Sequence, residues 1–118
     1  MADEIRITTG IQVSNGSLLV PAISSTKNYD QANPIAPAPG GVNVGTGEET
    51  ISFGDITPGW TYITNLDSAN YVEFGFSTGV YGMRLPAGSS MVFKMNGTSL
   101  FARANTAAVE IYVQGVND

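Results

Sequence analysis

The oxygen-bearing side chains best placed to bind a metal ion lie between residues 65 and 70. Asn65, Asp67 and Asn70 supply amide and carboxylate oxygens, which are the ligands that calcium prefers. The same residue types are common in turns, where Asp and Asn side chains bond to nearby backbone groups. A calcium loop needs several carboxylates at fixed spacing, and this segment has only one. We therefore interpret the segment as a turn between two strands and expect no metal.

Catalytic groups are scarce. Glu48, Glu49 and Asp55 flank one predicted strand, and paired carboxylates can hydrolyse glycosides. Adjacent residues of a strand point to opposite faces, so a solvated strand edge explains Glu48 and Glu49 better. Ser89 and Ser90 follow a glycine, but the chain has no His to activate a hydroxyl and no Cys. We expect no enzyme activity and no cofactor.

Aromatic residues offer a different chemistry. Trp60 is the only Trp, and Tyr62, Tyr71, Tyr81 and Tyr112 lie on neighbouring predicted strands. Exposed rings in one plane would stack on sugars, as in carbohydrate-binding modules. Buried rings would instead belong to the core or to a subunit interface. We favour the second interpretation and expect a core that contains Trp60, Phe74, Phe93 and Ile111.

Composition limits the partners. The chain has 118 residues, of which 42% are hydrophobic and 13% charged, with a net charge of −5. The charged fraction is about half the usual level, which predicts a surface covered by self-association. The five basic residues do not cluster, so we expect no direct nucleic-acid binding and no attraction to membranes.

The N-terminal residues are acidic and no apolar run follows them, which predicts no signal peptide and synthesis in a cytoplasm.

The elements that must position these side chains are short strands. Gly and Pro turn pairs recur at short intervals, and apolar residues alternate with polar ones between them. Asn15-Gly16 is a strong hairpin signal, and Pro21 is expected to end the following strand or to place it on a sheet edge. Roughly eight antiparallel strands predict an all-β fold, a β-sandwich of jelly-roll type, with residues 1–118 forming a single domain.

The segment from Ser24 to Gly47 breaks this pattern. Three prolines and a glycine pair make a regular strand or helix improbable there, so we expect an extended arm or long loop. The segment carries little charge, and disorder or docking on a neighbouring subunit would each explain it. The candidate interface residues are Tyr29, Pro34, Pro37, Pro39, Val42 and Val44.

The segment from Gly59 to Asp118 resembles small virion proteins of tailed bacteriophages. An aromatic strand leads into Asn65-Leu66-Asp67 and Asn70-Tyr71-Val72-Glu73, followed by Leu85-Pro86-Ala87-Gly88 and Leu100-Phe101-Ala102-Arg103-Ala104. The pattern looks most like the capsid decoration or cement class, and it is also similar to other virion components. The resemblance implies a structural virion protein that reinforces a capsid. Its partners would be the major capsid protein or other virion proteins, and it would form a homo-oligomer, with a trimer favoured. A tail, neck or fibre component and a carbohydrate-binding module are the alternatives.

Overall fold

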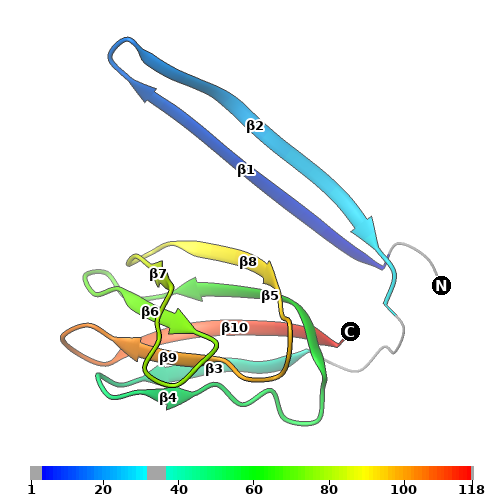
Figure 1. Ribbon diagram of the computed structural model, residues 1–118, viewed down its shortest axis with the longest axis vertical. Helices are drawn as coiled ribbons and strands as arrows, with labels where there is room; N and C mark the ends of the chain where they lie inside the picture. Colours follow the sequence, from blue (N-terminus) through cyan, green and yellow to red (C-terminus); the bar gives the residue numbers. More distant parts are fainter. Residues whose placement is uncertain (1–3, 32–36, 118) are drawn as a thin grey trace. The chain divides into compact units, whose positions relative to one another are not determined.

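The computed structural model describes residues 4–31 and 37–117 (Figure 1). Within these residues all regular structure is β-strand, and every strand pairing is antiparallel, which confirms the predicted all-β class. The sequence predicts one domain, whereas contacts divide the chain into two compact units, Met1–Asn33 and Pro34–Asp118. Each unit is described by itself.

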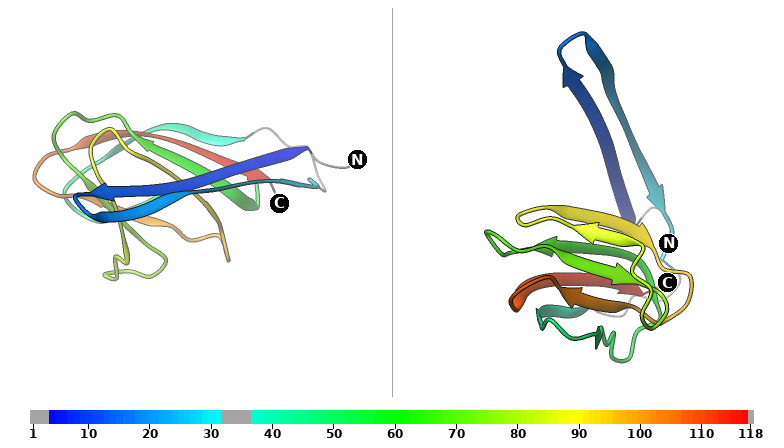
Figure 2. Two further views of the ribbon diagram at one scale, coloured as in Figure 1. Left: turned by 90° about the horizontal axis from the view of Figure 1, so that it is seen from above. Right: turned by 60° about the vertical axis from the view of Figure 1, so that its left-hand side comes forward.

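The first unit is a long β-hairpin of β1 (Ile5–Asn15) and β2 (Leu18–Tyr29), which run side by side in both views of Figure 2. The predicted turn is present, and Gly16 has a φ of 60°, a conformation that glycine adopts without strain. The register shifts between Ile11 and Val13, so Gln12 lies opposite Pro21 and Ala22 in a bulge. β2 continues past Pro21, so the proline does not end the strand. The other predicted alternative, a position on a sheet edge, is observed, because both strands of a two-stranded sheet are edges.

The second unit packs two four-stranded sheets against each other. One sheet has the order β3-β10-β5-β8 and the other β4-β9-β6-β7. The strands of the first sheet are β3 (Ala38–Val44), β10 (Val109–Asn117), β5 (Pro58–Asn65) and β8 (Ser90–Lys94). Those of the second are β4 (Glu49–Thr50), β9 (Phe101–Ala104), β6 (Val72–Gly75) and β7 (Met83–Leu85). We call this unit the sandwich.

The core of the sandwich lies between the inner faces of its sheets. Alternation along β10 buries Val109, Ile111 and Val113 completely, while the residues between them face outward. The predicted core positions of Phe74 and Ile111 are confirmed, since both side chains are fully buried. The remaining buried apolar residues are Val44, Ile51, Phe53, Ile56, Ile63, Val72, Leu85, Met95, Leu100, Ala102 and Ala104.

Two predicted core aromatics differ from this arrangement. Phe93 is half-buried and packs at the margin of the core, with its ring 6.1 Å from that of Phe76. The prediction for Trp60 is wrong, because β5 turns Thr61, Ile63 and Asn65 inward and Trp60 belongs to the alternate, outer set.

The predicted arm from Ser24 to Gly47 is not observed as such. Ser24 to Tyr29 belong to β2, and Ala38–Val44 form β3, so the expectation that prolines and glycines exclude a strand was wrong for both segments. β3 is an edge strand that pairs only with β10, and a sheet edge tolerates the missing N–H of Pro39. Residues 32–36, which include Pro34, lie outside the described residues.

Candidate interaction surfaces

The segment around Asp67 is a turn, as predicted. One carboxylate oxygen of Asp67 accepts hydrogen bonds from the backbone N–H groups of Asn70, at 2.6 Å, and Ala69, at 2.9 Å. These two donors, that of Asn70 first, lower the pKa of Asp67 below its ordinary value because they stabilise the charged form. The carboxylate is therefore used to close its own turn.

Asn65 has a structural role that the sequence analysis missed. Its side chain is buried, and its amide nitrogen donates to the carbonyls of Asn70, at 2.9 Å, and Leu85, at 3.2 Å. Its amide oxygen accepts from the backbone N–H of Asp67 at 2.9 Å. The side chain thus ties β5 to the turn that follows it and to the end of β7.

Within residues 4–31 and 37–117, no three His, Cys, Asp or Glu side chains form a group that could hold a metal ion.

The carboxylates of Glu48 and Glu49 are engaged separately. Glu48 accepts hydrogen bonds from the Tyr81 hydroxyl at 2.5 Å and from the backbone N–H of Gly79 at 2.7 Å. The hydroxyl of Tyr81 and then the N–H of Gly79 lower the pKa of Glu48, and the same carboxylate raises the pKa of Tyr81. Glu49 accepts from the backbone N–H of Gly45. Because each carboxylate holds a different loop, the two do not converge on one reacting group.

The outer face of sheet β4-β9-β6-β7 carries paired Arg and Tyr side chains, and we call it the Arg–Tyr face. The register places Glu73 between Arg84 and Arg103. Arg103 bonds Glu73 at 2.9 Å, which raises the pKa of Arg103, and its guanidinium lies 4.3 Å from the centre of the Tyr81 ring. Arg84 lies 4.1 Å from the centre of the Tyr71 ring. Stacking orients both guanidinium groups, and Tyr and Arg are the residue types that dominate protein interfaces energetically.

The outer face of sheet β3-β10-β5-β8 carries Trp60, Tyr62 and Tyr112, and we call it the aromatic face. Tyr62 and Tyr112 are 43% and 39% exposed, and Trp60 is half-buried. The Tyr62 hydroxyl donates to Ser90 Oγ, which bonds Thr64 Oγ1, each at 2.9 Å. The described tyrosine rings of this sheet face outward and do not belong to the core, which leaves sugar stacking and a subunit interface as the two interpretations.

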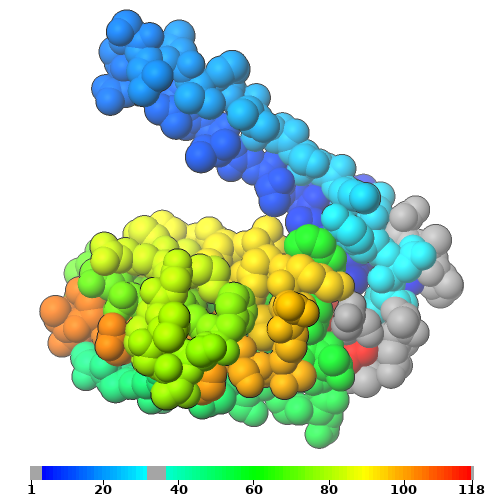
Figure 3. All heavy atoms as spheres, viewed as in Figure 1, coloured from blue at the N-terminus to red at the C-terminus, as the bar shows by residue number. Residues whose placement is uncertain are grey.

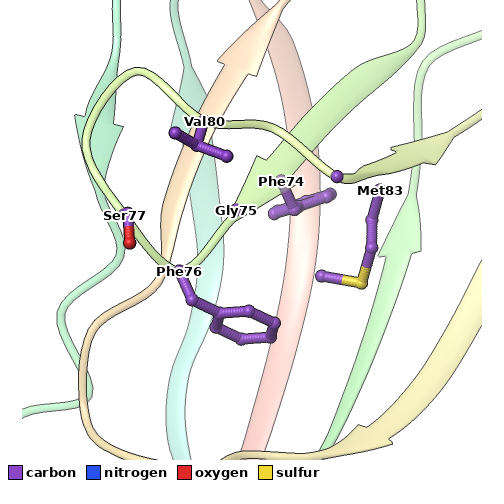
Figure 4. Close-up of a pocket in the computed structure, with 7 residues that line it drawn as sticks. Phe74, Gly75, Phe76, Ser77, Val80 and Met83 are labelled. Carbon is purple, nitrogen blue, oxygen red and sulfur yellow. The ribbon is translucent and has the colours of Figure 1, made fainter.

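An apolar pocket of about 250 Å³ lies where β6 turns into β7 (Figure 4). Its lining includes Phe74, Phe76, Val80 and Met83, and Phe76 and Val80 are 48% and 61% exposed. A Cβ atom on Gly75 would come within 1.7 Å of the Val80 carbonyl oxygen, so glycine is required where the turn lies on the strand. The pocket holds no polar side chain beyond Ser77 and offers no catalytic group.

The predicted interface residues do not form one surface. Tyr29 is half-buried at the end of β2, 5.4 Å from the Lys27 ammonium, and belongs to the hairpin unit. Pro37 and Pro39 are exposed, and Val42 packs against the core from β3. Val44 is completely buried in the core, which corrects its assignment as an interface residue. In the sequence, Val42 and Val44 are two residues apart with the polar Asn43 between them, which is the spacing of a strand and the signal for β3.

No helix long and apolar enough to cross a membrane occurs in the described part of the chain. Comparison with models of known protein families, with curated proteins and with solved structures finds no match. The resemblance to phage virion proteins therefore rests on the sequence pattern alone.

Proposed function

We propose that this chain is a structural virion protein that binds a bacteriophage capsid and reinforces it as a decoration or cement protein. The proposed mechanism is non-covalent. Many copies bind the assembled shell and not the free subunits, so they stabilise the assembled state by mass action. In this proposal the chain acts as a homo-oligomer, with a trimer favoured, and its partner is the major capsid protein or another virion protein.

The observation that carries this proposal is the exposed hairpin. Ile11, Leu18 and Ile23 are 58% to 64% exposed on one face of a two-stranded element, although a soluble monomer rarely exposes a contiguous apolar patch. A two-stranded hairpin is marginally stable without further packing. Its length and exposure favour a chain that works by attachment to other subunits.

The strand order of the sandwich supports the finer assignment as a jelly roll. Successive strands alternate between the sheets from β3 to β6, and β8, β9 and β10 return between them to complete the orders β3-β10-β5-β8 and β4-β9-β6-β7. Two four-stranded antiparallel sheets connected in this way are typical of a jelly roll, an architecture common to viral capsid proteins and lectins. The architecture alone does not choose between those two roles.

Co-sedimentation with capsids of the phage that encodes the chain tests the proposal. We expect saturable binding at a fixed ratio to the major capsid protein, and a higher temperature for capsid rupture when the protein is bound. A chain that stays in the supernatant at all concentrations, or that pellets without raising the rupture temperature, contradicts the role in reinforcement.

The aromatic face favours carbohydrate binding as a second candidate function. Tyr62 and Tyr112 present exposed rings on a sheet surface, and the hydroxyls of Ser90 and Thr64 lie beside Tyr62. Aromatic faces suit the C–H faces of sugars, and neighbouring hydroxyls suit their polar edges. This candidate predicts a soluble glycan as ligand.

A glycan array followed by titration separates the two candidates. Tyr62→Ala and Tyr112→Ala should weaken glycan binding at least tenfold if the aromatic face is the site. Tyr71→Ala is the matched control, because it removes a ring from the outer face of the other sheet. Equal losses in all three variants, or no glycan binding by the unchanged protein, would rule out this candidate.

A further inference from the structure

The hairpin has two chemically different faces. Cross-strand partners share a face, and the register pairs Ile11 with Ile23 and Val13 with Val20. The same face carries Ile5, Ile7, Thr9, Ile11, Val13 and Asn15 from β1 and Leu18, Val20, Ile23, Ser25, Lys27 and Tyr29 from β2, and we call it the apolar hairpin face. The opposite face is mostly polar, with Thr8 and Thr26 in hydrogen-bond contact at 3.3 Å.

Among the described residues of the hairpin unit, nothing covers this face. In the space-filling view the blue and cyan atoms of β1 and β2 form a narrow band (Figure 3). Ile11, Leu18 and Ile23 are 64%, 58% and 60% exposed. No residue of the hairpin is buried among its described residues, so the unit lacks a core. A two-stranded sheet with one apolar face is half of a sandwich, and it gains independent stability when a second layer covers that face.

The sandwich of the same chain offers no matching layer. Its inner apolar faces are already buried against each other. The outer faces of its two sheets mix exposed aromatic side chains, such as Tyr62 and Tyr112, with hydroxyl and charged groups, so neither is a continuous apolar face. Its described strands span 2 to 9 residues, whereas β1 and β2 span 11 and 12. The apolar sheet face with the right length and chemistry is that of another hairpin.

The charge of the apolar hairpin face also favours a second copy of the hairpin as its partner. Lys27 is the one charged residue on the apolar hairpin face among the described residues, and its ammonium lies 5.4 Å from the centre of the Tyr29 ring. Two such faces therefore meet without opposing rows of like charge, the usual obstacle to self-association of sheets.

We infer that the apolar hairpin face is a self-association surface that packs against the same face of a second copy of this chain. Stacked sheets lie about 10 Å apart, with the side chains of their inner faces interdigitating. The face offers fewer residues than the roughly 20–30 per side of a standard interface, so we expect micromolar affinity. The inference draws on the same exposed hairpin that supports the proposed function. Its test uses the protein alone in solution, so its outcome is distinguishable from that of capsid binding.

Analytical ultracentrifugation of the full chain with two adjacent substitutions tests the inference. Ile23→Glu places a charge on the apolar hairpin face, and Ser24→Glu places the same charge on the opposite face of the same strand. Because a contact between two identical faces closes as a dimer, we expect the unchanged protein and Ser24→Glu to form dimers with dissociation constants within about twofold of each other. A trimer would need a second interface elsewhere on the chain. Ile23→Glu should raise the dissociation constant at least tenfold, which corresponds to about 1.4 kcal/mol. A protein that is monomeric at all concentrations up to about 100 μM, or equal effects of both substitutions, overturns the inference.

Cross-linking keeps the test decisive if Ile23→Glu disturbs the hairpin itself. The chain has no Cys, so one introduced thiol can join only to another copy. A flexible bismaleimide that spans the ~10 Å between packed sheets should trap covalent dimers of Ile23→Cys and few of Ser24→Cys. Efficient trapping through Ser24→Cys alone, or none through Ile23→Cys, contradicts self-association through this face.

Discussion

Asn65→Ala should destabilise the sandwich substantially, although Asn65 is a small polar residue. The substitution removes hydrogen bonds to Asp67, Asn70 and Leu85 and leaves their backbone groups without that partner. At about 0.5–1.5 kcal/mol for each of the three bonds, the expected loss in the free energy of unfolding is about 1.5–4.5 kcal/mol. Urea unfolding followed by the fluorescence of Trp60 measures it, because Trp60 lies in β5 and reports on the sandwich.

Two further variants make this prediction specific. Asn43→Ala removes an exposed amide from β3 and should change stability by less than about 0.5 kcal/mol. Asn65→Asp keeps an acceptor for Asp67 but turns a carboxylate toward the carbonyls of Asn70 and Leu85, which raises its pKa. The Asn65→Asp variant should therefore become more stable as the pH falls, because the protonated carboxyl group can again donate a hydrogen bond to one of these carbonyls. A loss below about 1 kcal/mol for Asn65→Ala would refute the role assigned to this side chain.

Three other predictions test the packing and the turns. Gly75→Ala should cost about 1–3 kcal/mol because its Cβ meets a backbone carbonyl at 1.7 Å, whereas Gly82→Ala, with open space around it, should be nearly neutral in the same urea assay. Phe74→Ala should cost about 3–5 kcal/mol and Phe93→Ala roughly half as much, since only Phe74 is completely buried; equal losses would contradict the assigned strand face. The pKa of Asp67 is lowered, so its contribution is present above the ordinary carboxyl value of 3.8 and is lost as the pH falls below it. The stability difference between the unchanged protein and Asp67→Asn should therefore shrink below about pH 4, and a difference that grows there would contradict the turn geometry.

Local signals predicted much of the fold. The Asn15-Gly16 pair marks the hairpin turn, and the alternation of Val109, Ile111 and Val113 places β10 with the correct face inward. The bonding of Asp67 to the next residues of its own turn also follows from residue type. These features depend on residues near one another in the sequence.

Features set by distant residues were missed. β3 is a regular strand despite Pro39 because pairing with β10, about 70 residues away, leaves it on a sheet edge. The Arg–Tyr face could not be recognised because it depends on the register of Glu73 with Arg84 and Arg103. The outward position of Trp60 depends on which face of β5 meets the second sheet, and the chain there offers apolar side chains on both faces.

The most direct test of the proposed function is electron microscopy of virions that contain this chain. The proposal predicts density for the sandwich at symmetry-equivalent positions on the outer surface of the capsid, in contact with neighbouring capsid subunits. Density confined to the tail, neck or fibres, or absence of the chain from purified virions, would contradict a role in reinforcing the capsid.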